Sequence, residues 1–233
     1  MSENVTDNCI KLLDHGLVRL VDSMGSDLSV VRSARVSYDA EWRTGDNSDK
    51  DAKLINYLIK NRHTSPLESC VFTFEVKAPI FVLRQWHRHR TWSFNEISAR
   101  YAELPEEFYI PAEKVITTQS SSNKQMRTES THPHATYHRL LIEKANKASF
   151  TIYKEMLESG VPRELARSVL PVGTYSHMFA TVDLHNLMHF LNLRLHPHAQ
   201  YEIRVYAEAM LQLIEPIVPI CTAAFRKHLL TTT

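Results

Sequence analysis

The alternation of apolar and polar positions is clearest in residues 70–77, CVFTFEVK. A strict period of two over eight residues is typical of a strand with one buried face. Residues 16–25, GLVRLVDSMG, and 174–182, TYSHMFATV, carry the same signal more weakly, and a glycine turn ends the first of them. We therefore predict three strands, spaced widely along the chain.

Helical periodicity fills the intervals between these strands. Asp27 and Asp183 are placed to cap helices, Pro79 suits a first helical turn, and Gly160 suits a helix end. One predicted helix begins at Ser48 or Asp49 and has an apolar face formed by Leu54, Ile55, Leu58 and Ile59. A long helix after residue 132 ends at Gly160. The other predicted helices cover residues 28–38, 79–90, 162–170, 184–195 and 197 to about 215.

Two polar runs, residues 43–51 and 117–132, are predicted loops, and the second could serve as a lid or a folate contact. The chain shows no internal repeat and no linker. This order of elements indicates one α/β (α+β) domain over residues 1–233, a mixed β-sheet flanked by helices.

Composition narrows the class of protein. The 233 residues are 43% hydrophobic, enough for one sizeable core, and 27 Lys plus Arg nearly balance 26 Asp plus Glu. With this balance, the protein has no overall positive electrostatic field that would attract nucleic acid or an anionic membrane. We find no signal peptide pattern and no membrane-length apolar run, and the three cysteines are scattered, so we expect a cytoplasmic protein.

Residues 84–101, RQWHRHRTWSFNEISARY, concentrate cations and aromatic rings within this balanced chain. Surface ion pairs would explain isolated arginines. Planar cations beside aromatic and amide side chains instead favour a ligand with phosphates and flat rings. The five glycines lie too far apart to form a dinucleotide fingerprint or a P-loop, so side chains must hold any phosphates.

The segment RHRTWSFNEIS (88–98) resembles the signature of the flavin-dependent thymidylate synthases, Arg-His-Arg followed after seven residues by Ser. KAPIFVLRQW, ARYAELPEEFYIP, VPRELARSVLP and NLRLHPHAQYEIR also read like the family, so the resemblance spans about 16–215. It implies a homotetramer, with each active site shared between subunits, that converts dUMP to dTMP. The methylene carbon would come from 5,10-methylenetetrahydrofolate, and the reducing equivalents from NADPH through bound FAD.

The resemblance also implies roles for individual residues. The cofactor-binding residues would be His63, Ser65, Arg88, His89, Arg90, Glu96, Asp183, Leu184, His185 and His189. The dUMP-binding residues would be Gln85, Trp86, His87, Arg88, Glu96, Ile97, Ser98, Ala99, Arg100, Arg167 and Arg194. Arg194 would be catalytic, because a fixed guanidinium can stabilise the ionised N3 of uracil. Ser69 stands where many members have histidine, so that flavin contact is not carried over.

Other chemistries fit the sequence less well. Cys9, Cys70 and Cys221 lie away from the arginine motifs, which disfavours a cysteine nucleophile. Ser98 has no evident histidine–carboxylate relay, so we interpret it as a binding hydroxyl. His134/His138 and His185/His189 have the spacing of helical metal pairs but lack a zincin glutamate, and we expect no metal.

Two other functions stay open. WHRHRTW could bind single-stranded nucleic acid, although the carboxylates nearby and the near-zero net charge oppose this. A flavoprotein of the same fold without synthase activity is the other alternative. It would have little reason to keep Gln85, Ser98, Arg167 and Arg194 together.

Overall fold

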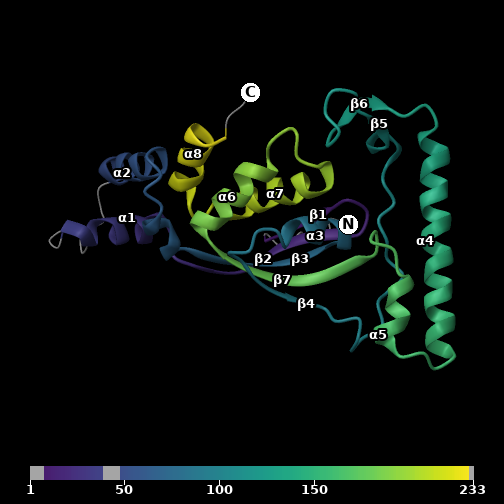
Figure 1. The fold of residues 1–233 in the computed structure, drawn as a ribbon. Helices are drawn as coiled ribbons and strands as arrows, with labels where there is room; N and C mark the ends of the chain where they lie inside the picture. Colours follow the sequence, from purple (N-terminus) through teal and green to yellow (C-terminus); the bar gives the residue numbers. More distant parts are fainter. Residues whose placement is uncertain (1–7, 39–47, 231–233) are drawn as a thin grey trace, which may run out of the picture.

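The computed structural model describes residues 8–38 and 48–230. Most of the predicted 43–51 loop and the start of the N-terminal segment lie outside these residues. A five-stranded sheet forms the centre, in the order β1 (Cys9–Leu12), β2 (Gly16–Met24), β3 (Val71–Pro79), β7 (Tyr175–Asp183) and β4 (Ser93–Glu96) (Figure 1). The predicted α+β class is confirmed. All four pairings in the sheet are antiparallel, where a mixed sheet was expected.

The register of β3 explains which face of the sheet is buried. Phe72, Phe74 and Val76 are fully buried, while the residues between them are partly exposed on the other face. On that second face the hydroxyls of Thr73 and Thr181 lie 3.0 Å apart across β3 and β7. The alternation in residues 70–77 therefore predicted both the strand and its orientation.

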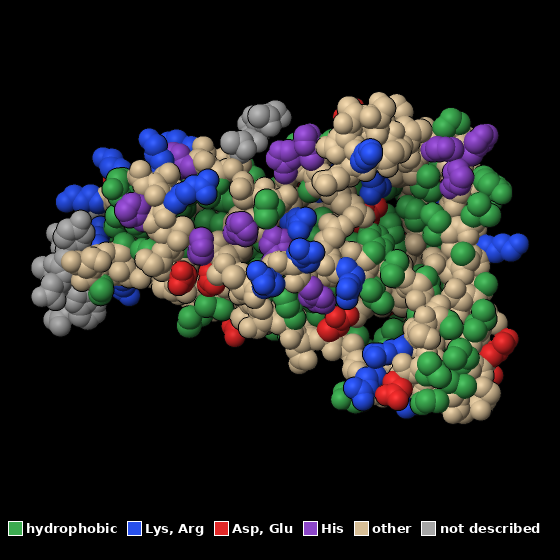
Figure 2. All heavy atoms as spheres, in the orientation of Figure 1, with side chains coloured by type: hydrophobic (Ala, Val, Ile, Leu, Met, Phe, Trp, Pro, Cys, Tyr) green, Lys and Arg blue, Asp and Glu red, His purple; other side chains and the backbone are tan. Residues whose placement is uncertain are grey.

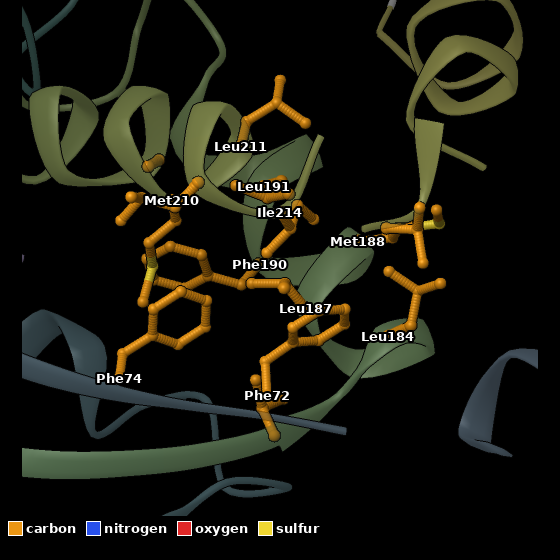
Figure 3. Packing of buried hydrophobic residues seen from close by; sticks show 14 of the residues in the cluster. Phe72, Phe74, Leu184, Leu187, Met188, Phe190, Leu191, Met210, Leu211 and Ile214 are labelled. Carbon is orange, nitrogen blue, oxygen red and sulfur yellow. The ribbon is translucent and has the colours of Figure 1, made fainter. Parts of the chain in front are cut away.

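Helices α6 (Leu184–Arg194) and α7 (Tyr201–Ile214) cover the buried face (Figure 1). Figure 3 shows Phe190, Met210 and Ile214 from these helices against Phe72 and Phe74 of the sheet. Asp183 begins α6 as predicted, since its carboxylate accepts a bond from the backbone N–H of Asn186 at 2.9 Å. This packing holds α6, with Arg194 at its end, firmly against the sheet.

The remaining helices lie at the two ends of the sheet (Figure 1). At one end are α1 (Asp27–Arg35), α2 (Ser48–Lys60) and α8 (Pro219–His228); at the other stand α4 (Ala135–Glu158) and α5 (Arg163–Ala166). Short 3₁₀ turns cover Val36–Tyr38, Ser65–Ser69, Glu113–Val115 and Arg167–Val169, and α3 (Ile80–Trp86) follows β3. No helix in the described parts of the chain is long and apolar enough to span a membrane.

The helix predicted over 79–90 is too long. Helix α3 ends at Trp86. The N–H groups of Arg88 and His89 bond three residues back, to Gln85 at 3.3 Å and to Trp86 at 2.9 Å. The cause is packing. Trp86 and Trp92 both enter the core, with ring centroids 5.8 Å apart, so the chain must turn between them.

The polar run 117–132 is a hairpin, where we expected a loop. Strands β5 (Thr117–Gln119) and β6 (Arg127–Thr131) pair antiparallel, and the Gln119 amide donates to the Met126 carbonyl at 2.7 Å. The hydroxyls of Thr118 and Thr128 lie 2.6 Å apart. Polar side chains supply much of this pairing, so the hairpin leaves no apolar alternation to detect.

The C-terminal helices also differ from the prediction. Residues 196–199 form a turn, in which the Ala199 N–H bonds the His196 carbonyl at 2.8 Å, and α7 begins only at Tyr201. A second helix, α8, follows where we predicted no element. Strand β1 was also missed, because four residues are too few for a periodicity signal.

Asp27 caps a helix other than the one predicted. Ser26 is the N-cap of α1, whereas the buried Asp27 carboxylate accepts bonds from the N–H groups of Ile220 and Cys221, at 2.8 and 2.9 Å. The side chain therefore ties the N-terminus of α8 to α1, two elements far apart in the sequence.

We expect Asp27→Ala to lower the free energy of unfolding by about 1–2 kcal/mol, the usual cost of losing an N-cap. Urea unfolding measures this change. Asp27→Asn keeps one acceptor oxygen and should lose less. Equal stability of Asp27→Ala and the parent protein would show that the cap contributes nothing.

Candidate active site

The Arg-His-Arg motif occupies the turn between α3 and β4. His89 is buried at 7% exposure, whereas Arg88 and Arg90 on either side are exposed. The turn therefore points the histidine into the protein and both arginines outward. Trp86, whose ring stacks on Phe190 at 4.9 Å, and Trp92 anchor the two ends of this turn.

His89 meets Arg194 at the end of α6. The Arg194 Nε–H donates to His89 Nε2 at 3.1 Å. Because a guanidinium can only donate, His89 must be neutral and carry its proton on Nδ1. Burial, then the charge of Arg194, lowers the pKa of His89 to about 4. Two sequence-predicted residues 105 positions apart thus form one unit.

This contact predicts a pH dependence of stability. The unfolded chain takes up a proton near the ordinary histidine pKa of 6.5, while folded His89 does so only near 4. Stability should therefore fall as pH drops between these values, by up to about 1.4 kcal/mol per pH unit. His89→Gln keeps an acceptor but does not titrate, and urea unfolding from pH 8 to pH 4 should show a shallower decline. Parallel profiles would contradict this account.

Arg88 and Arg90 are cations without a partner inside the protein. Most arginines elsewhere pair with carboxylates, as Arg35 does with Asp51 at 2.6 Å. In residues 8–38 and 48–230, no hydrogen bond or ion pair involves the guanidinium group of Arg88 or Arg90. Figure 2 shows Lys, Arg and His side chains gathered at the middle of one face, over the region of α3. Two exposed guanidiniums suit the phosphates of FAD.

Glu96 ends β4 beside the same turn. Its carboxylate accepts a bond from the Ser176 hydroxyl of β7, and His87 Nε2 lies 3.9 Å from its second oxygen. Strand pairing fixes the backbone here, since the N–H of Ile97 donates to the His177 carbonyl at 2.8 Å. The structure thus brings Glu96 and His87 together and leaves Ile97 exposed next to them.

The loop at residues 98–100 belongs to a second group of predicted site residues, which includes Arg100 and Arg167. The Ser98 hydroxyl accepts from the Arg100 N–H at 3.3 Å, and Arg100 lies 3.7 Å from Glu164 of α5. Arg167 donates to the Glu164 carbonyl at 3.3 Å. Arg100 and Arg167 therefore both contact Glu164.

A third group of predicted site residues lies at the N-terminal end of α6, the end opposite to Arg194. Asp183, Leu184 and His185 begin this helix, and the Leu184 N–H bonds the Cys70 carbonyl just after the 3₁₀ turn that contains Ser65. His63 is exposed before that turn, with its ring 5.6 Å from Tyr57. His189 connects this helix with the motif, because its ring centroid lies 6.1 Å from that of His89.

Besides His89, three of the sequence-predicted site residues have side chains in the interior. Trp86 and Leu184 are fully buried, and Ala99 is 9% exposed. Their side chains support the fold, so only their backbone atoms could face a ligand. For Trp86, this agrees with the sequence interpretation of a core aromatic residue.

The cysteines are unsuited to nucleophilic catalysis. Cys70 and Cys221 are fully buried, and burial raises the pKa of the Cys70 thiol to about 11. Burial also raises the pKa of Cys221. The described residues contain no group of three or more His, Cys, Asp or Glu side chains that could hold a metal ion.

Sequence reasoning missed the residues that support the site. Gln85 donates to Gln200, Gln200 bonds the buried Glu202, and Glu202 pairs with Arg127 of β6. Helix α7 also contains Arg204 and Glu208, so no sequence pattern set Gln200 and Glu202 apart. Arg127 lay in a run that we had interpreted as a loop.

Comparisons with known proteins show which family this chain resembles in sequence. Residues 19–220 match the family model described as "Thymidylate synthase complementing protein". The chain is 48% identical over 224 residues to a flavin-dependent thymidylate synthase of Treponema denticola, covering 95% of this chain and 83% of the relative. It is 49% identical over 221 residues to that of Thermus thermophilus, covering 95% and 79%.

Solved structures show the same fold. The UMP/dUMP methylase PolB of Streptomyces cacaoi, bound with 5-Br dUMP, superposes with a TM-score of 0.85 at 37% identity, over 96% of this chain and 100% of that one. The same methylase bound with 5-Br UMP gives 0.84 at 38% identity, over 96% and 99%. The match extends over nearly the whole chain, and the chain belongs to the flavin-dependent thymidylate synthase family.

Proposed function

We propose that this chain converts dUMP to dTMP, with Arg194 as the catalytic residue. The observation that carries this proposal is the partly buried contact between Arg194 and neutral His89. The contact holds a guanidinium at one position without neutralising it, because a neutral imidazole accepts its hydrogen bond and no carboxylate among the described residues pairs with it. A fixed, unneutralised cation is what a developing uracil anion requires.

Arg194 would act by charge. As uracil N3 loses its proton, negative charge spreads onto the ring, and a guanidinium within hydrogen-bond reach lowers the energy of that state. Burial lowers the pKa of Arg194, but an arginine stays charged at neutral pH. The interior position of Cys70 and Cys221 supports a route without a covalent enzyme nucleophile.

FAD is the cofactor of this family, and the donor set of the motif fits it. Arg88 and Arg90 would hold its phosphates, while His63, Ser65, Glu96, Asp183, His185 and His189 would line the remainder. When bound, the flavin supplies reducing equivalents, which we propose come from NADPH. The methylene carbon would come from 5,10-methylenetetrahydrofolate.

The nucleotide would lie between two sets of residues. Gln85, His87, Arg88 and Glu96 flank the motif, and Ser98, Arg100 and Arg167 provide cationic and hydroxyl donors suited to a phosphate. Arg167 bonds the Glu164 carbonyl of α5, whereas Arg194 bonds His89 at the end of α6. As the family resemblance implies, we infer that several subunits contribute to each dUMP site.

A homotetramer is consistent with the surface of α4. Tyr137, Leu140, Leu141 and Ile152 are exposed on this helix, which stands beyond the end of the sheet (Figure 1). Exposed apolar residues on one element are typical of an interface. We also infer a single domain over residues 1–233, since one core cluster runs from Val18 to Phe225. The cytoplasmic location stays a prediction.

A flavin spectrum and a nucleotide titration test this proposal. We expect purified protein to absorb near the flavin maximum and its spectrum to shift on addition of dUMP. Single-stranded DNA should leave the spectrum unchanged. A colourless protein that binds DNA would instead favour the nucleic-acid-binding alternative.

A further inference from the structure

A chain of hydrogen bonds connects the β5–β6 hairpin to the last turn of α3. The Arg127 guanidinium of β6 bonds Glu202 Oε2 at 2.6 Å, and the Gln200 amide nitrogen bonds the same oxygen at 2.9 Å. Gln200 Oε1 then accepts a bond from the Gln85 amide nitrogen. We call Arg127, Glu202 and Gln200 the relay.

The charge on Glu202 sets the direction of every bond in this chain. An ionised carboxylate only accepts, so Gln200 must turn its NH₂ group toward Glu202. Its carbonyl oxygen then faces Gln85. A carbonyl oxygen only accepts as well, so Gln85 must turn its own NH₂ group toward Gln200. The Gln85 carbonyl oxygen is thereby directed away from the relay.

The Glu202 carboxylate is held firmly enough to fix the orientation of the Gln200 amide. Its side chain is only 4% exposed, and Arg127 and the Tyr109 hydroxyl, 3.3 Å from Oε1, keep it bonded on both oxygens. A buried carboxylate bonded in this way has one arrangement available to it. Arg127 is in turn fixed, because it also donates to the Val115 carbonyl at 3.0 Å.

We propose that Gln200, Glu202 and Arg127 are positioning residues that orient the amide of Gln85 for the nucleotide. Gln85 then offers its carbonyl oxygen to a hydrogen-bond donor on dUMP, which is either the sugar 3′-hydroxyl or the uracil N3–H. This inference rests on the proposed function, which places Gln85 in the nucleotide site. It also gives the hairpin a part in substrate binding, since the relay begins on β6.

The inference makes Glu202→Gln a sharp test, because glutamine has the same shape but its amide can also donate. Without the carboxylate, the amides of Gln200 and Gln85 can both reverse. We expect the Kd for dUMP to rise about threefold to tenfold, the value of one oriented hydrogen bond. The flavin content and kcat at saturating dUMP should change little. Gln200→Leu, which leaves the Glu202–Arg127 pair intact, should give the same loss and serves if Glu202→Gln folds poorly.

A double-mutant cycle shows whether the relay acts through Gln85. We expect Glu202→Gln and Gln200→Leu to have no further effect on dUMP binding in a Gln85→Ala background. Tyr109→Phe, which removes a bond to Glu202 but not the Gln200 contact, is the control and should leave the Kd unchanged. Titration with 2′,3′-dideoxyuridine monophosphate distinguishes the donors, because Gln85→Ala should not weaken its binding if the 3′-hydroxyl is the partner.

Two results would overturn the proposal in different ways. Equal losses in the parent and Gln85→Ala backgrounds would show that the relay acts without Gln85, and the proposed function would be unaffected. If Gln85→Ala bound dUMP as tightly as the parent protein, both the relay and the place of Gln85 in the nucleotide site would be wrong.

Discussion

Arg194→Ala is expected to lower kcat about 100- to 1,000-fold while the purified protein keeps its FAD. Removing one preorganised donor from a site of developing charge typically costs this much. Arg194 lies at the C-terminal end of α6, and in the described residues the only hydrogen bond of its side chain is to His89. The substitution would therefore remove the proposed transition-state contact without breaking an internal ion pair.

Arg194→Lys is the informative companion. It retains a positive charge but loses the planar guanidinium and the Nε–H that bonds His89. We expect its turnover to lie between those of the parent protein and Arg194→Ala. Steady-state kinetics and the ratio of flavin to protein absorbance measure both properties. If Arg194→Ala turned over dUMP normally, the catalytic role would be wrong; if it lost its flavin, Arg194 would be a cofactor-binding residue.

A double substitution of Arg88 and Arg90 by alanine is expected to yield folded protein depleted of FAD. Both side chains are exposed and have no internal partner among the described residues, so their loss should cost the fold little. Each charge-assisted bond to a phosphate contributes about 1.5–3 kcal/mol. The loss of two should weaken FAD binding at least about 100-fold.

The matched control is Arg32→Ala with Arg139→Ala. It removes the same total charge from α1 and α4, away from the motif. Flavin absorbance, with circular dichroism to verify folding, should show full FAD in the control and little in the Arg88/Arg90 variant. Full occupancy in both proteins would refute the role of the motif as a phosphate cradle.

The sequence predicted the elements whose side chains alternate or cap in a simple way. Strand β3 and the Asp183 cap of α6 lie where the pattern placed them. The end of α3 could not be predicted, because it depends on Trp86 and Trp92 meeting Phe190, 98 or more residues further along the chain. Contacts over such separations leave no trace in local periodicity.

The candidate site shows the same division. The family resemblance predicted roles for Arg88, His89 and Arg194. Only the fold shows that His89 turns inward and accepts a bond from Arg194. The relay could not be predicted from the sequence for a different reason. Gln200, Glu202 and Arg127 are each ordinary as single polar residues, and their proposed role depends on the direction of the hydrogen bonds between them.

The most direct test of the proposed function is dTMP formation, followed by mass spectrometry. The protein is incubated with dUMP and 5,10-methylenetetrahydrofolate, with FAD present, and with or without NADPH. We predict dTMP only when NADPH is added, with tetrahydrofolate as the second product. Folded, flavin-containing protein that forms no dTMP under these conditions would contradict the assignment of dUMP methylation to this chain.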